Sequence, residues 1–174
     1  MPVITLGKTM SKKLLIYGVI IFVSIFADQI SKNMILQHLQ YMERVAVIPG
    51  FFDLILVYNT GAAFSFLAGA GGWQKFFFIG LALIICIFLL KAIIRDELGK
   101  AGKIAAAMII GGALGNVIDR LIYGHVVDFI LLYYHNWFYP AFNIADSCIC
   151  VGAVLLVLES IFHQKIKSSK FQSW

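Results

Sequence analysis

Charged side chains are scarce in this sequence. Of its 174 residues, 13% are Asp, Glu, Lys or Arg, 61% are hydrophobic, and the mean hydropathy is +0.89. This balance leaves too much apolar surface for one small soluble domain, so we expect an integral membrane protein. The alternating apolar and polar residues of a membrane β-barrel are also missing. Because lipid-facing backbone must be hydrogen-bonded within its own segment, helices remain as the membrane-spanning elements.

Cysteine is scarce as well. The three cysteines, Cys86, Cys148 and Cys150, lie in apolar stretches and form no Cys-x-x-Cys pair. We therefore interpret them as small buried hydrophobic residues with no disulfide or metal role, and we expect no cofactor.

Basic residues outnumber acidic ones by fourteen to nine, for a net charge of +5. They flank the apolar runs, which indicates orientation in a bilayer and no nucleic-acid partner.

Four apolar runs are near the roughly 20 residues that a helix needs to cross a membrane. The predicted fold class is an all-α integral membrane protein, a single membrane domain over residues 1–174. Its expected helices cover about 14–36, 76–94, 104–121 and 141–162. Between the first two, an extracytoplasmic β segment is expected at about 40–70, where Val45–Ile48 and Phe51–Tyr58 read as short strands around Pro49-Gly50.

The cations predict the topology. Ten of them lie before the first helix, between the second and third, or after the fourth: Lys8, Lys12, Lys13, Lys91, Arg95, Lys100, Lys103, Lys165, Lys167 and Lys170. The cation-rich side of a membrane protein faces the cytoplasm, so both termini are expected inside. The first helix is interpreted as a retained signal anchor, because Ile25 stands where cleavage after Ala27 would need a small residue.

With this topology, the polar residues near the membrane gather at the outer leaflet. They form sets at helical spacing: Asp28 and Lys32; Asn116, Asp119 and Arg120; Asn143, Asp146 and Ser147. Each set shares one helix face, and Asp128 lies in the loop between the last two helices. Gly111-x-x-x-Gly115 predicts close helix packing beside the second set.

Asp128 and Asp146 suggest chemistry, because an ionisable residue at membrane depth usually has a function. Two close carboxylates share one proton, so the ionised member can deprotonate water while the protonated member polarises a carbonyl. Aspartic proteolysis uses this arrangement.

Simpler interpretations stand beside it. Asp28 with Lys32, and Asp119 with Arg120, fit structural ion pairs. Lys32 could activate Ser65 or Ser147 as in a serine–lysine peptidase, and His125, Asp128 and His135 are a weak metal candidate without a recognised spacing. Tyr133, Tyr134, Trp137 and Tyr139 fit an interfacial aromatic belt.

Four ordered motifs resemble bacterial lipoprotein signal peptidase, also called signal peptidase II. They are Asn59-Thr60-Gly61-Ala62-Ala63-Phe64-Ser65, the stretch Gly111–Arg120, Val126-Val127-Asp128-Phe129-Ile130 and Phe142-Asn143-Ile144-Ala145-Asp146-Ser147. Their order and the length of the chain fit this family along nearly the whole sequence.

The resemblance implies an aspartic endopeptidase of the bacterial inner membrane that cuts prolipoproteins on the N-terminal side of a diacylglyceryl-modified cysteine. Its catalytic pair would be Asp128 and Asp146. Supporting or substrate-contacting residues would be Asn59, Gly61, Asn116, Arg120 and Asn143, with Asp28, Lys32 and Asp119 ordering the helices. Cyclic peptides of the globomycin type would inhibit it. Lipid would surround it, and a monomer is expected.

Two other classes of function remain open. A small proton-coupled transporter would also use intramembrane carboxylates, with Glu159 as the candidate for continuing a polar path inward. A scaffold without chemistry would leave the one-sided polar cluster unexplained.

Overall fold

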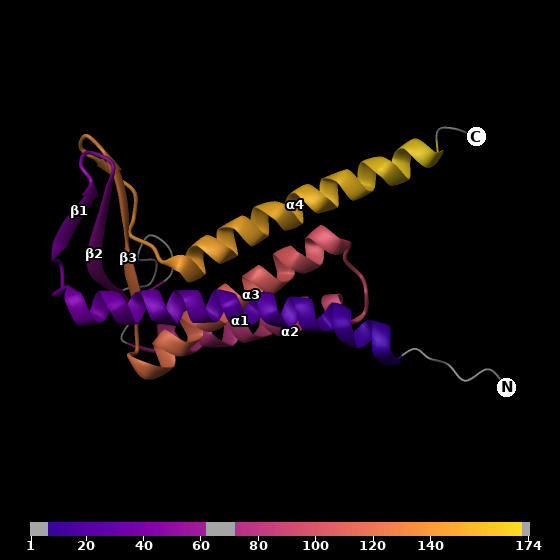
Figure 1. Cartoon of the computed structure of the whole chain (residues 1–174), viewed down its shortest axis with the longest axis horizontal. Helices are drawn as coiled ribbons and strands as arrows, with labels where there is room; N and C mark the ends of the chain where they lie inside the picture. Colours follow the sequence, from indigo (N-terminus) through magenta and orange to yellow (C-terminus); the bar gives the residue numbers. More distant parts are fainter. Residues whose placement is uncertain (1–6, 62–71, 172–174) are drawn as a thin grey trace.

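Helices dominate the structure. The computed structural model describes residues 7–61 and 72–171, and within these ranges the chain forms four helices and four strands (Figure 1). The helices are α1 (Gly7–His38), α2 (Gln74–Ile94), α3 (Lys100–Ile122) and α4 (Ile144–Phe171). The strands are β1 (Arg44–Ile48), β2 (Phe52–Asn59), β3 (Val126–Tyr134) and β4 (Trp137–Phe138).

Each of these four helices is long and apolar enough to span a membrane. Large apolar side chains point away from the protein, including Phe22 on α1 and Phe88 on α2, which are 65% and 69% exposed. Exposed apolar surface of this extent needs lipid around it. The predicted fold class is confirmed, and the chain is a multi-pass membrane protein.

Helix α3 is the centre of the bundle. Small residues let the neighbouring helices approach it: a Cβ atom on Gly111 would lie 2.6 Å from Ser24 of α1, and one on Gly112 would collide with the Ala145 carbonyl of α4. Gly115 packs in the same way against the Asp28 carboxylate. The close packing predicted from the glycine spacing is confirmed.

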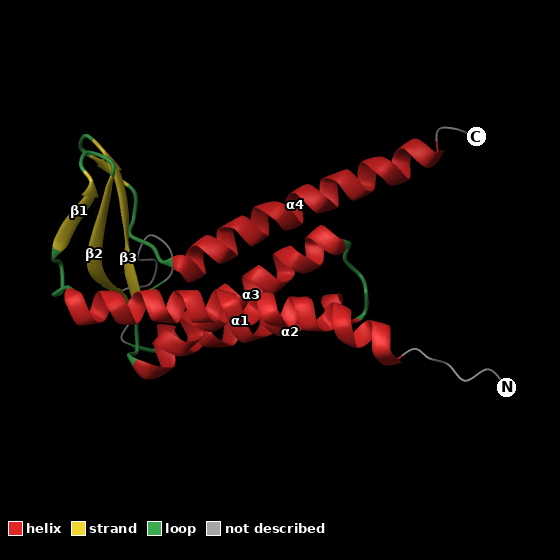
Figure 2. Ribbon diagram, viewed as in Figure 1, coloured by secondary structure: helices red, strands yellow, loops and turns green. Residues whose placement is uncertain are grey.

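The β-sheet is larger than the sequence indicates. The predicted hairpin around Pro49-Gly50 is present as β1 and β2, with Gly50 at φ 84° in the turn. The sheet continues with β3 beside β2 (Figure 2). The short β4 completes it, in the antiparallel order β1-β2-β3-β4. Asp128 was expected in a loop, and this placement is wrong: it lies on β3, opposite Val57 of β2.

The start of α4 differs from the predicted one. The sequence predicts its start near residue 141, whereas the helix begins at Ile144. Phe142 instead forms an isolated antiparallel bridge with Ile130 of β3, and its carbonyl accepts hydrogen bonds from Phe129 and Ile130. The sheet therefore holds the segment that leads into α4.

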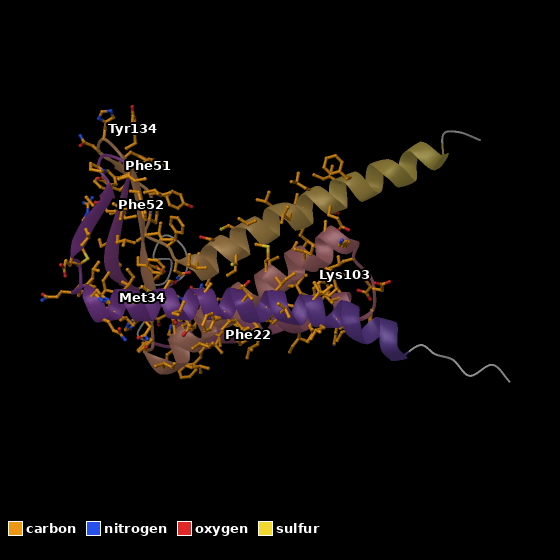
Figure 3. The ribbon with its side chains drawn as sticks, in the orientation of Figure 1. Phe22, Met34, Phe51, Phe52, Lys103 and Tyr134 are labelled. Carbon is orange, nitrogen blue, oxygen red and sulfur yellow. The ribbon has the colours of Figure 1, made fainter. Side chains whose placement is uncertain are left out.

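The sheet crosses one end of the helix bundle, opposite the end at which α1 begins and α4 ends (Figure 1). Ile35 of α1, Leu56 of β2, and Val127 and Phe129 of β3 form the apolar cluster that joins sheet to bundle. Phe51 and Tyr134 lie at the far end of the sheet, away from the helices (Figure 3). The junction between sheet and bundle is where the conspicuous polar residues meet.

Candidate active site

Asp146 lies in the first turn of α4, where hydrogen bonds to Asn143, three residues earlier in the chain, hold it in position. Its backbone N–H donates to Oδ1 of Asn143 at 2.8 Å, and its Oδ2 accepts from the Asn143 N–H at 3.3 Å. This reciprocal pair is a capping box at the helix start. It satisfies N–H groups that the first turn would leave unpaired, and it holds the carboxylate of Asp146 close to Asn143.

Asp128 reaches the same place from β3 and is 2% exposed. Its Oδ2 accepts a hydrogen bond from Asn59 at 3.0 Å, and its Oδ1 accepts one from Nδ2 of Asn143 at 2.7 Å. Asn143 therefore contacts both aspartates: its side-chain oxygen accepts from Asp146 and its amide nitrogen donates to Asp128. The two carboxyl groups share one small site.

Burial dominates the electrostatics of Asp128. Burial above all, together with the negative charge of Asp146, raises the pKa of this carboxyl from 3.8 to about 7, while hydrogen bonds from Asn59 and Asn143 act in the opposite direction. A carboxyl with this pKa holds its proton over part of the neutral range. The site can thus contain one protonated and one ionised carboxyl group.

A buried ionic cluster supports the two aspartates. Nζ of Lys32 lies 2.7 Å from Asp28, 2.8 Å from Asp119 and 3.0 Å from Oδ1 of Asn116. Asn116 then donates through Nδ2 to Asp146 at 2.8 Å. The charge of Lys32 is therefore connected to one carboxyl group of the site through a single asparagine side chain.

The acidic members of this cluster also fix the backbone next to each aspartate. Asp119 accepts a hydrogen bond from the N–H of Val127, the residue before Asp128, at 3.0 Å. Asp28 accepts one from the N–H of Ala145, the residue before Asp146, at 2.9 Å. The cluster thus positions both strand β3 and the start of α4.

Arg120 has a different role from the one that the sequence suggests. An ion pair with Asp119 is not formed in the described part of the chain, because Asp119 faces Lys32. The Arg120 guanidinium instead donates to the carbonyl of Gly61 at 2.8 Å and to that of Asn116 at 3.3 Å. It therefore holds the turn after β2, where Asn59 also accepts from the Gly61 N–H.

A cavity of about 830 Å³ opens at the two aspartates. Asn59, Gly61, Asn116 and Arg120 line it, and the remaining wall is mainly apolar, from β3, the segment 138–142 and the first turns of α4. Among the described residues, Asp128 and Asp146 are its only carboxylates. The cavity could hold an extended or lipid-bearing chain with one bond facing this pair.

The residues that the sequence offers for a serine–lysine peptidase or a metal site do not form such sites in the described part of the chain. Ser147 lines the cavity but donates to the Asn143 carbonyl, and Ser65 lies outside the described residues, as does the motif from Ala62 onward. His125 packs against Tyr58, and His135 occupies the turn between β3 and β4. In the part of the chain that the structure describes, no three His, Cys, Asp or Glu side chains gather as metal ligands.

The sequence does not predict the positions of two residues, Gln29 in the ionic cluster and Tyr139 in the cavity wall. Gln29 donates to Asp119 at 2.8 Å and to the Gly115 carbonyl at 3.2 Å, so it completes the ionic cluster. Its position beside Asp28 in an apolar helix was an available signal. Tyr139, expected in an interfacial belt, also lines the aspartate cavity, and like Tyr134 and Trp137 it is exposed.

Comparisons with known proteins agree with this arrangement. The model of the family described as signal peptidase (SPase) II matches residues 20–162. A relative named lipoprotein signal peptidase from Neisseria meningitidis serogroup B is 64% identical over 89% of this chain and 94% of its own length. One of the same name from Chromobacterium violaceum is 55% identical over 79% of this chain and 85% of its own.

The fold is shared with solved structures. A bacterial membrane enzyme matches with a TM-score of 0.79 and 32% identity over 87% of this chain and 90% of the other. A second bacterial membrane enzyme matches with a TM-score of 0.72 and 33% identity over 82% of this chain and 90% of the other. The chain therefore belongs to the signal peptidase II family and is a membrane peptidase.

Proposed function

We propose that this protein removes signal peptides from prolipoproteins by aspartic proteolysis, cutting on the N-terminal side of a cysteine that carries diacylglycerol. Family membership and the names of the relatives support the substrate class. The observation that carries the mechanism is the placement of Asp128 and Asp146 in one cavity, both hydrogen-bonded to Asn143.

The proposed reaction needs only these two carboxyl groups and water. The ionised member takes a proton from water, the oxygen attacks the scissile carbonyl, and the protonated member donates to the carbonyl oxygen. The resulting tetrahedral diol collapses as its C–N bond breaks and a proton passes to the amine. The products are a signal peptide with a new carboxyl terminus and a chain that begins with the lipid-modified cysteine.

Each supporting residue has a proposed task in this scheme. Asn59 and Asn143 orient Asp128, and Asn116 orients Asp146. Lys32, Asp28 and Asp119 order α1, α3, β3 and α4 around the site. Arg120 and Gly61 form the rim where substrate would enter. No metal or organic cofactor takes part in these steps.

The proposed location is the bacterial inner membrane, with both termini in the cytoplasm. The cation-rich α2–α3 connection, the start of α1 and the end of α4 all lie at the end of the bundle opposite the sheet (Figure 1). With cations inside, the sheet and the aspartate cavity face the outer leaflet. A substrate confined to the membrane would then reach the site by diffusing sideways.

The other candidate functions have less support. Every hydrogen-bond partner of the Lys32 ammonium in the described chain is a carboxylate or amide oxygen, and none is a serine hydroxyl. For a transporter, Glu159 would continue the polar path, yet its carboxylate accepts from the Gly99 N–H at the start of α3. There it serves as a helix cap.

The deciding experiment is cleavage of a diacylglyceryl-cysteine prolipoprotein by the purified protein, with products identified by mass spectrometry. We expect a cut just before the modified cysteine, its inhibition by a globomycin-type cyclic peptide, and loss of about 10³-fold or more in rate for Asp128→Asn and Asp146→Asn. The exposed carboxylate of Glu97 supplies the control Glu97→Gln. Full activity in both aspartate variants would refute the proposal, and proton flux into liposomes would then be tested.

A further inference from the structure

Arg44 lies on the face of the sheet that walls the aspartate cavity. It is the first residue of β1, and its Nε donates to Oδ2 of Asp53 on β2 at 3.0 Å. The Asp53 side chain is 5% exposed and that of Arg44 is 40% exposed, so a partly exposed cation is anchored to a buried carboxylate. Separating the two would leave a buried charge without its partner. The ion pair therefore fixes where the Arg44 guanidinium lies.

This guanidinium contacts two aromatic rings of the other strands. Cζ of Arg44 lies 5.3 Å from the ring centroid of Tyr133 on β3 and 5.3 Å from that of Phe138 on β4. The two rings are themselves stacked, with centroids 5.5 Å apart. A guanidinium stacks on aromatic faces through its planar surface, which an ammonium group lacks. Arg44 thus ties β4 to β1 across the sheet.

Strand β4 depends on side-chain contacts of this kind. The strand has two residues, and its ladder with β3 has two pairs. A ladder this short is marginally stable by itself. The hydroxyl of Tyr133 adds a further tie within the sheet, because it accepts a hydrogen bond from the Gly50 N–H at 3.0 Å. The guanidinium contact therefore helps to hold β4 in place.

Phe138 of β4 is part of the cavity wall and is 49% exposed. It pairs with Tyr133, which is five residues along β3 from Asp128. At about 3.3 Å per residue, it lies roughly 16 Å from Asp128 along the strand, toward the end of the sheet where Tyr134 lies (Figure 3). An extended polypeptide covers this distance in about five residues.

The cavity has two ends, one on each side of the aspartates. Ile149 and Val151 line it on α4, which runs from Asp146 away from the sheet (Figure 1). Leu131 and Phe138 line it on the sheet. In the proposed orientation the sheet is at the outer end of the bundle, so a signal peptide that spans the membrane would lie along α4. The chain that follows the modified cysteine lies outside the membrane and would pass along the sheet.

We propose that the wall formed by Phe138 binds the residues that follow the modified cysteine, and that Arg44 is the positioning residue that holds this wall. The inference rests on the proposed function. It gives Arg44 a role in substrate affinity and none in bond cleavage, because the two aspartates are held by three asparagines, Asn59, Asn116 and Asn143. Aromatic faces bury large contact area, so the wall would take an extended chain of varied sequence.

The first test uses the natural chain and so does not depend on a variant folding. Two peptides carry the same signal peptide and the same diacylglyceryl-cysteine; one ends at that cysteine as an amide, and the other continues for six residues. We expect the longer peptide to have a KM about tenfold lower at similar kcat, as for binding energy that is equal in the ground and transition states. Equal KM values for the two peptides would overturn the proposal.

The second test changes Arg44. Arg44→Lys keeps a positive charge beside Asp53 but removes the planar group that stacks on Phe138. The KM for the longer peptide should rise about fivefold at unchanged kcat, whereas both constants for the shorter peptide should stay at the values of the natural chain. Arg95→Lys makes the same change at a position that is 69% exposed, and it should match the natural chain on both peptides. An equal rise in KM for both peptides would mean that Arg44 supports the fold in general, and would overturn the assignment.

A double-variant cycle tests whether Arg44 acts through Phe138. Phe138→Leu should give the same selective rise in KM for the longer peptide. Combining it with Arg44→Lys should add nothing further, because the ring that the guanidinium holds is already gone. Rises in KM that multiply in the double variant would show that Arg44 acts by another route.

Cleavage separates this inference from the proposed function. If the natural chain cuts both peptides with equal KM, the peptidase proposal stands and the wall assignment is wrong. If the natural chain cuts neither peptide, the proposed function fails and the wall assignment falls with it.

Discussion

Lys32 of α1 and Asp119 of α3 form an ion pair in the interior of this membrane protein, with Nζ 2.8 Å from Oδ2 and both side chains at most 2% exposed. Asp28 closes the pair into a cluster of two carboxylates and one ammonium group. Buried charges are costly to separate from their partners. The arrangement connects three helices and strand β3 at the level of the candidate active site.

Removing the ammonium group should therefore destabilise the fold. Lys32→Met keeps most of the side-chain volume but leaves Asp28 and Asp119 buried without their cation, and we expect the free energy of unfolding to fall by about 3–5 kcal/mol. Denaturant unfolding in detergent micelles measures this. Lys91→Met, at an exposed position of α2, is the matched control and should change stability by less than about 1 kcal/mol. Equal stability in the two variants would contradict the structural role of the cluster.

Asn116 should affect turnover more than substrate binding. Asn116→Leu preserves volume but removes the donor that orients Asp146 and the acceptor for Lys32. A reacting group that is displaced by about 1 Å from its productive position can lower kcat by roughly 10²-fold. Steady-state kinetics on a lipidated peptide should show the loss mainly in kcat. Asn33→Leu, the same change at an exposed position of α1, should leave kcat near that of the natural chain; a rise confined to KM would refute the orienting role.

The raised pKa of Asp128 should make stability depend on pH. This pKa is about 7 in the folded protein and 3.8 ordinarily, so between about pH 4 and 7 the folded chain retains a proton that the unfolded chain has released. The free energy of unfolding of the natural chain should fall through this window and level off above it. Asp128→Asn removes the titrating group. The free energy of unfolding of this variant should therefore equal that of the natural chain near pH 4 and exceed it by about 2–4 kcal/mol at pH 8.

Thermal unfolding in detergent at pH 4, 6 and 8 provides the measurement for this prediction. Glu97→Gln changes an exposed carboxylate and should follow the pH dependence of the natural chain. If the curves of the natural chain and Asp128→Asn stay parallel across the whole range, Asp128 does not titrate near neutral pH.

The substitution of glycine by alanine should have opposite effects on stability at Gly112 and at Gly80. Gly112→Ala would drive a methyl group into the Ala145 carbonyl at the contact of α3 with α4, whereas a Cβ on Gly80 of α2 meets nothing within 4 Å. We expect Gly112→Ala to destabilise the fold by about 1–3 kcal/mol and Gly80→Ala to stabilise it by up to about 1 kcal/mol. Unfolding midpoints in one detergent compare them. Because α4 carries Asp146, Gly112→Ala should also lower activity, and a fully active, stable variant would contradict this packing.

Much of the architecture follows from the sequence because it depends on local properties. Apolar length determines the four helices, the Pro49-Gly50 turn determines the β1–β2 hairpin, and helical spacing places Asn116 and Asp119 on one face. The capping box between Asn143 and Asp146 is also local, since both partners lie within one turn. Motifs of this kind allowed the family to be identified from residue order alone.

Tertiary structure decided the contacts between distant segments. Strand β3 forms because β2 offers it a partner across roughly seventy residues, and its sequence, buried on both faces, lacks the alternation that marks an exposed strand. Asp119 pairs with Lys32 of α1 and not with its neighbour Arg120, because the fold brings a buried ammonium group to it and turns the guanidinium toward Gly61. Sequence by itself determined which residues carry the polar chemistry and which segments cross the membrane. Only the packing of β3 against β2 and of α4 against α3 brought Asp128 and Asp146 to one cavity, because contacts between remote segments depend on the whole fold.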